Sequence, residues 1–345
     1  MSASPTQPLR GAIIGAGYFS QFHYEAWTRI PEVKIVAASN RTLEKAEKKC
    51  RDYGIPTSYG DWKEMIDTEK PDFVDIITPP PTHLEICSYL AERNIHMICQ
   101  KPITPSYEES VELATLVDST EARFMVHENW RWQPWYRNIK ALLDEGTLGK
   151  LFSIHFLMRV GDGWGEDAYL DRQPYFRDYP QLLMFETGVH FLDTFRYPGG
   201  EVSSLYAKLN KRNPVIAGED SGIVICNFSN GATATLDANR FNEADTDDAR
   251  FTFGVMRIDS SKGHLQMNLA GDMTFNPLGE PTQTIEYEYP RINFASDCCF
   301  QLQRHFVEHL LNKLPFESEA EDYLKTLNLV EACYKSAATG QVVTL

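Results

Sequence analysis

The chain has 345 residues, enough for two ordinary domains, and its hydrophobic content of 43% and charged content of 23% are typical of a soluble globular protein. Its formal net charge of −15 argues against a general binder of nucleic acid or of anionic membranes, since both need concentrated positive charge. No apolar run is long enough to span a bilayer, the N-terminus lacks an apolar signal core, and the seven cysteines show no CxxC spacing, which together predict a cytoplasmic protein with reduced thiols.

Strands and helices alternate through residues 1–125. Short apolar runs predict strands within 10–17 and at 33–38, 71–78, 95–100 and 123–129. Segments of helical character lie between them, at 19–30, 42–54, 62–66, 83–94 and 107–120. Alternation of this kind indicates βαβ units. The first domain is therefore predicted to be an α/β Rossmann domain, with a doubly wound parallel sheet and helices on both faces.

The pattern changes in residues 126–345. A helix at 135–149 is followed by strands at 150–160, 203–210, 221–228, 232–240 and 250–259. Asn230-Gly231 joins two of these strands, which is a strong hairpin signal. A last helix at 320–338 precedes a short terminal strand. These features predict an α+β domain with a large, mainly antiparallel, open-faced sheet.

A glycine turn follows the first strand in AIIGAGYFS. Gly15 permits a tight turn, and Gly17 lets the backbone approach a pyrophosphate at the start of the next helix. Ser20 stands at the third position of the usual pattern and is small enough for close packing. The turn predicts a dinucleotide site to which Gly15, Gly17, Tyr18 and Phe19 contribute.

The second strand ends in ASNRT, where dinucleotide folds usually carry an acidic residue for the ribose hydroxyl. This chain has Asn40, which can bond a hydroxyl without repelling a 2′-phosphate, followed by Arg41, which can stack on adenine or grip that phosphate. A surface role for Arg41 stays open. The pair is compatible with NAD or NADP, with a slight preference for NAD because only one basic residue is present.

Two further segments end predicted strands. DIITPPPTH cannot continue as a strand after its prolines, so Thr78, Pro79 and His83 are predicted at the carboxyl edge of the sheet, where such folds bind ligands. His83 as a plain helix-start residue is the alternative. ICQKPIT places Lys101 after an apolar run, either as a solvated strand end or as a group directed at a ligand.

Residues 182–200 have helical apolar spacing and end at Pro198-Gly199-Gly200. Glu186 and His190 are four residues apart and share a helical face. Histidine is the usual base for a hydroxyl proton near neutral pH, and a neighbouring carboxylate would orient it. For Asp193, a hydrogen bond on the helix surface or between the domains is expected rather than a role in the chemistry.

These segments together resemble the glucose–fructose oxidoreductase, inositol dehydrogenase and MocA (Gfo/Idh/MocA) family. The resemblance rests on GAGYFS, TPPPTH, QKPIT and ETGVHFLDTFRY, and it covers roughly residues 8–345. It implies that Lys101 bonds the reacting oxygen and that His190 is the general base. Gln100 replaces the usual Glu of the family's Glu-Lys-Pro fingerprint but stays a candidate cofactor contact, and Glu186 stands where Asp is more frequent.

The resemblance also implies a substrate site. Asn129 and Arg131 fall where relatives line the active site, and Trp130, Trp132 and Trp135 are candidates for an apolar wall against a sugar. Trp164, Tyr169 and Arg172 lie in a glycine-rich loop able to close over a substrate. No cluster has metal-site spacing, so no metal is expected.

The predicted activity is NAD(P)-dependent oxidation of a hydroxyl of a small sugar or polyol. The whole sequence is also similar to bacterial pentose dehydrogenases of the apiose type, which implies an aldose oxidised to its lactone. An NAD-dependent glycoside hydrolase and a non-catalytic nucleotide sensor are the alternatives. Apolar alternation in the second sheet predicts that its outer face is covered. The resemblance implies that the domain of residues 126–345 binds the substrate and forms a homodimer or homotetramer through this face, and that the C-terminal helix packs back on the first domain.

Overall fold

The computed structural model describes residues 7–345. Contacts within the chain divide it into two units: one runs up to Asn129 and includes Cys298–Lys325, and the other comprises Trp130–Asp297 and Thr326–Leu345. The division falls within the last helix, α9(Ala320–Thr339). The predicted boundary after residue 125 stays a prediction. No helix is predicted from the sequence at α8(Cys298–Leu311), which belongs to the first unit.

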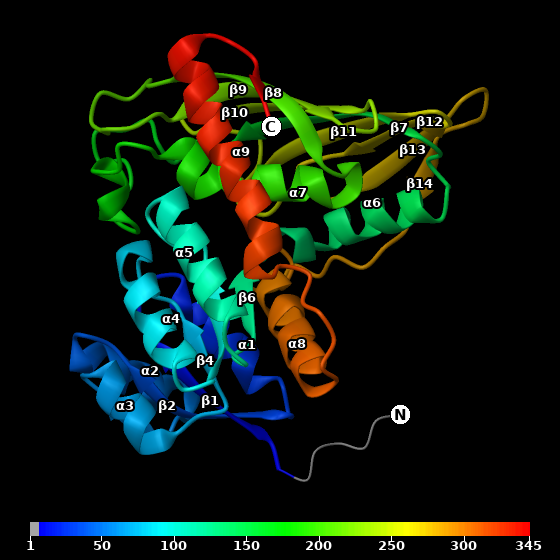
Figure 1. Ribbon diagram of the computed structural model, residues 1–345. Coiled ribbons are helices and arrows are strands. Elements are labelled where there is room, and N and C mark those ends of the chain that lie inside the picture. Colours follow the sequence, from blue (N-terminus) through cyan, green and yellow to red (C-terminus); the bar gives the residue numbers. More distant parts are fainter. Residues whose placement is uncertain (1–6) are drawn as a thin grey trace. The chain divides into compact units, whose positions relative to one another are not determined.

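The first unit contains a six-stranded parallel sheet of order β3-β2-β1-β4-β5-β6 (Figure 1). Its strands are β1(Leu9–Ile14), β2(Val33–Ser39), β3(Thr57–Tyr59), β4(Phe73–Ile76), β5(His96–Gln100) and β6(Phe124–His127). β4 is buried throughout, as expected for a parallel strand covered on both faces. The predicted doubly wound α/β fold is confirmed.

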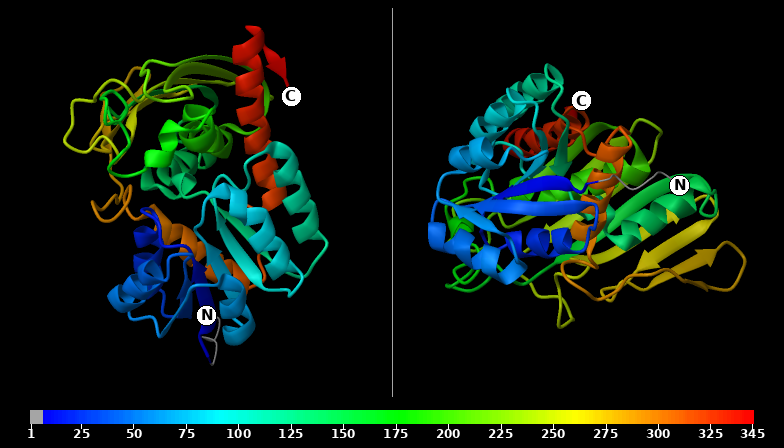
Figure 2. Two further views of the ribbon diagram at one scale, coloured as in Figure 1. Left: turned by 90° about the vertical axis from the view of Figure 1, so that its left-hand side faces the viewer. Right: turned by 90° about the horizontal axis from the view of Figure 1, so that it is seen from below.

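Helices connect these strands in the order expected from the sequence. They are α1(Ser20–Thr28), α2(Leu43–Tyr53), α3(Trp62–Glu69), α4(His83–Ala91) and α5(Tyr107–Asp118), with a short 3₁₀ turn, η1(Pro80–Thr82), before α4. Right-handed crossovers that run in opposite directions from β1 and β4 put α1 and α4 on opposite faces of the sheet. Figure 2 shows this: in its right-hand view, α1 lies below the blue strands and the cyan helices lie above them.

The order of this sheet defines where a ligand would bind. β1 lies between β2 and β4, so the connections leave it in opposite directions on its two sides. Doubly wound folds bind ligands at such a switch point, beyond the carboxyl ends of the strands. The glycine turn, ASNRT, TPPPTH and QKPIT segments all begin at that edge.

The second unit contains a nine-stranded sheet of order β14-β13-β12-β11-β7-β10-β9-β8-β15. Its strands are β7(Leu151–Arg159), β8(Val202–Asn210), β9(Ser221–Phe228), β10(Thr233–Asn239), β11(Gly254–Ser260), β12(Gly263–Met267), β13(Met273–Pro277), β14(Gln283–Ile285) and β15(Val343–Thr344). β7 and β10 pair in parallel, and the other neighbours are antiparallel. The predicted mainly antiparallel sheet is confirmed, and so is the Asn230-Gly231 hairpin between β9 and β10.

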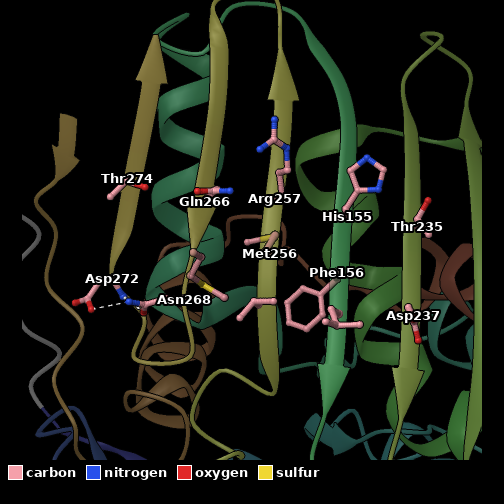
Figure 3. Close-up of a pocket in the computed structure, with 13 residues that line it drawn as sticks. His155, Phe156, Thr235, Asp237, Met256, Arg257, Gln266, Asn268, Asp272 and Thr274 are labelled. Carbon is pink, nitrogen blue, oxygen red and sulfur yellow. Dashed lines mark hydrogen bonds between the residues drawn. The ribbon is translucent and has the colours of Figure 1, made fainter. Parts of the chain in front are cut away.

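The two faces of this sheet differ. α6(Pro134–Asp144) and α7(Val189–Gly199) lie along one face (Figure 1). The other face exposes apolar side chains, among them Leu157, Ile223 and Ile225. Across its strands runs a hollow of about 510 Å³, lined by residues that include His155, Asp237, Arg257, Gln266 and Thr274 (Figure 3). None of the predicted catalytic residues lines this hollow.

Several details differ from the sequence prediction. The segment predicted as one helix from residue 182 begins as a π-helix, η4(Leu183–Gly188), and becomes α-helical only from Val189. The strand predicted from residue 250 begins at Gly254, because Phe253 has a left-handed backbone with φ of 63°. Within residues 7–345, no helix is long and apolar enough to cross a membrane.

Candidate active site

The glycine turn has the shape that a pyrophosphate needs. Gly15 has φ of +119°, and a Cβ there would lie 2.7 Å from the carbonyl oxygen of Ile77. A Cβ on Gly17 would meet nothing within 4 Å, so the backbone there is open to a ligand. The cap of α1 is Phe19, whose side chain has no hydrogen-bond acceptor for the first helical amides. The turn therefore fits a dinucleotide with its phosphates at the start of α1.

Asn40 supports this turn from the end of β2. Its side-chain oxygen accepts a hydrogen bond from the backbone N–H of Ala16 at 3.2 Å, and its amide nitrogen donates to the carbonyl of Thr42 at 2.9 Å. Arg41 is exposed. Asn40 thus ties the glycine turn to the next loop, and its predicted contact with a ribose stays a prediction, as does that of Arg41.

His83 joins two loops at the carboxyl edge of the sheet. Its Nε2 lies 2.7 Å from the carbonyl oxygen of Thr78, and its Nδ1 lies 3.1 Å from that of Ile103. The ring is fully buried, and burial lowers the pKa of His83 to about 4. The sequence predicts a cofactor contact for His83, but the structure uses the ring as a brace beneath the surface. Thr78 and the exposed Pro79 remain at the loop surface.

Lys101 follows β5 at the same edge and is partly exposed. The Lys101–Pro102 peptide bond is cis. The backbone N–H of Lys101 donates to the side-chain oxygen of Gln100 at 2.8 Å. Gln100 itself is buried, with 8% of its surface exposed. It therefore contacts the lysine loop from below, and the predicted contact with a cofactor stays a prediction.

Asn129 ends the first unit as a buried residue. Its amide nitrogen donates to the sulfur of Cys298 at 3.0 Å, and only 1% of the residue is exposed. The sequence predicts a substrate contact for Asn129, whereas the structure uses its amide to join the end of β6 to α8.

In the second unit, a buried carboxylate holds the start of the helix that carries His190. Glu219 accepts hydrogen bonds from the backbone N–H groups of Leu182 and Met184, at 3.3 and 3.0 Å. The hydroxyl of Tyr334 donates to the same carboxylate at 2.6 Å and accepts the backbone N–H of Phe185 at 3.1 Å. Glu219 thus satisfies amides that a helix start leaves without partners.

His190 lies in the first turn of α7, with 5% of its surface exposed. Its ring stacks on Trp130, with ring centroids 4.5 Å apart and an angle of 4° between the planes. Phe191 and Phe253 contact the same indole, so Trp130 is fixed on several sides. The Trp130 ring fixes the plane of the His190 imidazole.

Arg131 and Asp193 form a buried ion pair. The guanidinium donates through Nε and Nη2 to both carboxylate oxygens, at 2.8 and 2.5 Å. Thr326 also donates to Asp193, at 3.2 Å. The sequence predicts a substrate contact for Arg131, but this bidentate pair orients its guanidinium toward α7. The sequence predicts a hydrogen bond of Asp193 on the helix surface or between the domains, whereas Asp193 is fully buried and pairs with residues of its own unit.

Glu186 belongs to a cluster of charges that the sequence did not reveal. Its carboxylate accepts a hydrogen bond from the Thr187 hydroxyl at 2.8 Å and lies 3.6 Å from Nη1 of Arg240. Arg240 also donates to both oxygens of Asp162, at 3.0 and 2.6 Å, and Arg172 reaches Asp162 at 2.9 Å. Glu186 is therefore held beside a buried arginine.

The ion pair between Arg240 and Asp162 keeps both of these groups charged. Burial alone would raise the pKa of Asp162, but the guanidinium of Arg240 outweighs burial and holds that pKa below its usual range. Burial alone would lower the pKa of Arg240, and the Asp162 carboxylate outweighs that effect and raises it. Both groups are charged at neutral pH, so Glu186 lies against a fixed positive charge.

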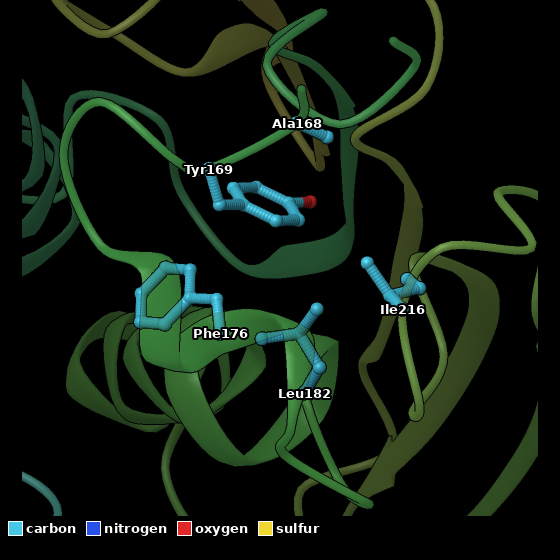
Figure 4. Close-up of a cluster of buried hydrophobic side chains, with 5 residues drawn as sticks. All are labelled: Ala168, Tyr169, Phe176, Leu182 and Ile216. Carbon is cyan, nitrogen blue, oxygen red and sulfur yellow. The ribbon is translucent and has the colours of Figure 1, made fainter. Parts of the chain in front are cut away.

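Tyr169 and Trp164, both predicted to contact a substrate, lie in different environments in the structure. Tyr169 packs in an apolar cluster with Ala168, Phe176, Leu182 and Ile216 (Figure 4). Burial raises its pKa to about 12, and 6% of the residue is exposed. The sequence predicts a substrate contact for Tyr169, but the structure shows it as a core residue.

Trp164 is 55% exposed, and its indole N–H donates to Glu243 at 3.1 Å. It remains available to a ligand.

The sequence signals missed most of these partners. Arg240 directly follows β10 and belongs to no motif, and Glu219 lies in a loop without a motif. His23 and Asp75, which form a buried pair in the first unit, lie inside an ordinary helix and strand. Within residues 7–345, no group of three or more His, Cys, Asp or Glu side chains could hold a metal ion.

Comparison with known proteins agrees with this architecture. The profile of the Gfo/Idh/MocA oxidoreductase family with an NAD-binding Rossmann fold matches residues 9–128, and that of the family's C-terminal domain matches residues 136–265. D-apiose dehydrogenases of Rhizobium rhizogenes and Paraburkholderia graminis are each 29% identical over 98% of this chain, which corresponds to 97% and 90% of their own lengths.

Among solved structures, an oxidoreductase from Agrobacterium radiobacter in complex with NAD⁺, L-tartaric acid and magnesium superposes with a TM-score of 0.90. It is 27% identical, and the match covers 98% of each chain. Two consecutive family profiles and full-length relatives thus agree with the sheet order and the glycine turn. This chain belongs to the Gfo/Idh/MocA family of oxidoreductases.

Proposed function

We propose that the protein is an NAD(P)-dependent dehydrogenase that oxidises a hydroxyl of a small sugar, with His190 as base and Lys101 as the group that stabilises the reacting oxygen. The observation that carries the proposal is Lys101 at the end of β5, on the same sheet edge as the open glycine turn. Doubly wound folds bind a dinucleotide beyond this edge, so a lysine at the end of β5 would lie near the reactive ring.

The residues that would hold the dinucleotide are Gly15, Gly17, Tyr18 and Phe19, with Asn40 and Arg41 at the adenosine end. When bound, the nicotinamide accepts a hydride from the carbon that bears the substrate hydroxyl. We propose NAD as the preferred form, because Arg41 is the one basic residue of the ASNRT segment available to a 2′-phosphate.

His190 would take the hydroxyl proton as the C–H bond breaks. Its stacking on Trp130 limits ring rotation, so the basic nitrogen keeps one direction. Lys101 would donate a hydrogen bond to the oxygen and stabilise the negative charge that develops on it. Glu186 contributes a carboxylate from the segment directly before α7, 3.6 Å from Nη1 of Arg240.

The proposed substrate is an aldose in its ring form, and D-apiose is the first to test. Loss of the proton of the anomeric hydroxyl to His190, together with loss of a hydride from the anomeric carbon to a bound nicotinamide, would leave a lactone and so balance the reaction. The full-length similarity to D-apiose dehydrogenases supports this choice.

The test is NADH or NADPH formation with apiose, other aldoses, inositols, polyols and sugar acids. A strong response to one aldose supports the proposal. Retained nucleotide with no net NADH would favour a hydrolase or a sensor.

We also propose that the protein is a cytoplasmic homo-oligomer that covers the outer face of the second sheet. Ile223 is 46% exposed and Ile225 is 40% exposed on adjacent positions of that face. Light scattering should give a dimer or tetramer mass, and Ile223→Glu should shift it toward the monomer. A monomeric mass for the unaltered chain would rule the oligomer out.

A further inference from the structure

Beneath Lys101 lies a buried chain of hydrogen bonds that no step of the proposed reaction uses. Asp75 on β4 accepts from Nε1 of Trp27 at 2.7 Å and lies 2.9 Å from Nδ1 of His23. Nε2 of His23 lies 3.0 Å from the amide nitrogen of Gln100, whose oxygen lies 2.8 Å from the backbone nitrogen of Lys101. His23 and Asp75 are both fully buried.

The donor and acceptor of each hydrogen bond in this series follow from the backbone N–H of Lys101. A backbone N–H can only donate, so the group of Gln100 that faces Lys101 must be its oxygen. The amide NH₂ must then face His23, and Nε2 of His23 must accept. With Nε2 as an acceptor, the proton of His23 lies on Nδ1 and is donated to Asp75. The opposite orientation of the amide would set two donors against each other at Lys101.

Glutamate at position 100 would require a different protonation state of His23. A carboxylate accepts from the Lys101 N–H and cannot donate, so Nε2 of His23 would also have to donate. His23 would then carry protons on both nitrogens between two carboxylates, with the ring of His127 stacked on it at 3.8 Å. The choice between Gln and Glu at position 100 therefore sets the protonation state of a buried imidazole.

We infer that Gln100 is a positioning residue: it fixes His23 as a neutral imidazole protonated on Nδ1 and, through that chain, holds the backbone that presents Lys101. Its effect on catalysis rests on the proposed function, whereas its effect on the tautomer does not. Asp75 and Trp27 anchor the far end of the chain within the sheet and α1.

The first arm of the test measures the tautomer directly. Full-length protein labelled with ¹⁵N at its nine histidines would be studied by long-range ¹H–¹⁵N NMR, with His23→Gln used to assign the signal. The expected signal shows protonated Nδ1 and unprotonated Nε2. In Gln100→Glu, both nitrogens should carry protons at the same pH, while the signal of His83 should not move. A His23 protonated on Nε2 in the unaltered protein would overturn the inference.

The second arm measures turnover with the best substrate. Gln100→Leu fills the space but loses both hydrogen bonds, so kcat should fall by about 10-fold to 100-fold with little change in nucleotide affinity. Gln100→Glu restores the acceptor for Lys101 and should regain most of that loss. Unchanged kcat in a folded Gln100→Leu variant would refute the positioning role. If Lys101→Met were fully active, the proposed function would fail, and the NMR result would still decide the tautomer.

Discussion

The region around Lys101 and the region around Glu186 hold their polar groups by different means. Around Lys101, neighbouring parallel strands end at one edge, and the partners of each loop are backbone groups or side chains at strand ends. Around Glu186, an arginine that directly follows β10 pairs with an aspartate from a loop, and these two residues lie far apart in the sequence. The first arrangement follows from strand order, whereas the second depends on a long-range ion pair.

The largest expected effects come from removing one of the two proposed catalytic side chains. Lys101→Met and His190→Ala should each lower kcat by about 10³-fold, because each deletes one group that acts on the reacting oxygen. Nucleotide affinity, measured by fluorescence titration, should change little. If both variants kept normal turnover, neither region would be part of the active site.

Removing the central ion pair should destabilise the second region. Arg240→Met leaves Asp162 buried without its main partner and should lower the free energy of unfolding by about 3–5 kcal/mol, as measured in urea. The matched control is Arg159→Met, whose partly exposed pair with Asp237 should contribute less than about 1 kcal/mol. Equal effects from the two variants would show that the buried pair has no special role.

The buried His83 ring, which joins two loops of the first region, should make the stability of the protein depend on pH. The folded pKa of His83 lies at about 4, below the ordinary value of 6.5, so the unfolded chain binds the proton more readily. Stability is unaffected above pH 6.5 and should fall by about 3 kcal/mol as pH drops from 6.5 to 4.

His83→Gln should remove this part of the slope, and substitution of the half-exposed His155 should leave it in place. Urea unfolding at several pH values measures both variants. A slope unchanged in His83→Gln would mean that the ring is not held neutral.

The smallest expected effects are those of alanine substitutions in the glycine turn, which should separate stability from nucleotide affinity. Gly15→Ala forces a Cβ against Ile77 at a positive φ and should cost about 1–3 kcal/mol of stability. Gly17→Ala meets no protein atom, so stability should stay unchanged while nucleotide affinity falls. Loss of stability in both variants, with equal affinity, would argue against a phosphate site over Gly17.

The sequence predicts the first region well because its signals are local. A glycine turn, a proline run and a Lys-Pro pair each follow an apolar strand, and parallel order brings such segments to one edge. Helical spacing singles out His190, whose role as base stays a prediction. The sequence does not predict that Asn129, Arg131 and Tyr169 are used by neighbouring side chains, since nothing in a motif shows which groups lie opposite. Glu219, Arg240 and α8 have no local signal, so only the packed chain reveals them.

The most direct test of the account is NAD(P)H formation on D-apiose by the unaltered protein and by Lys101→Met. The account predicts steady reduction of NAD by the unaltered protein, lactone as product, and about 10³-fold slower turnover in the variant with nucleotide still bound. Full activity in the variant would contradict the role of Lys101. No reduction with any sugar, despite bound nucleotide, would contradict the dehydrogenase itself.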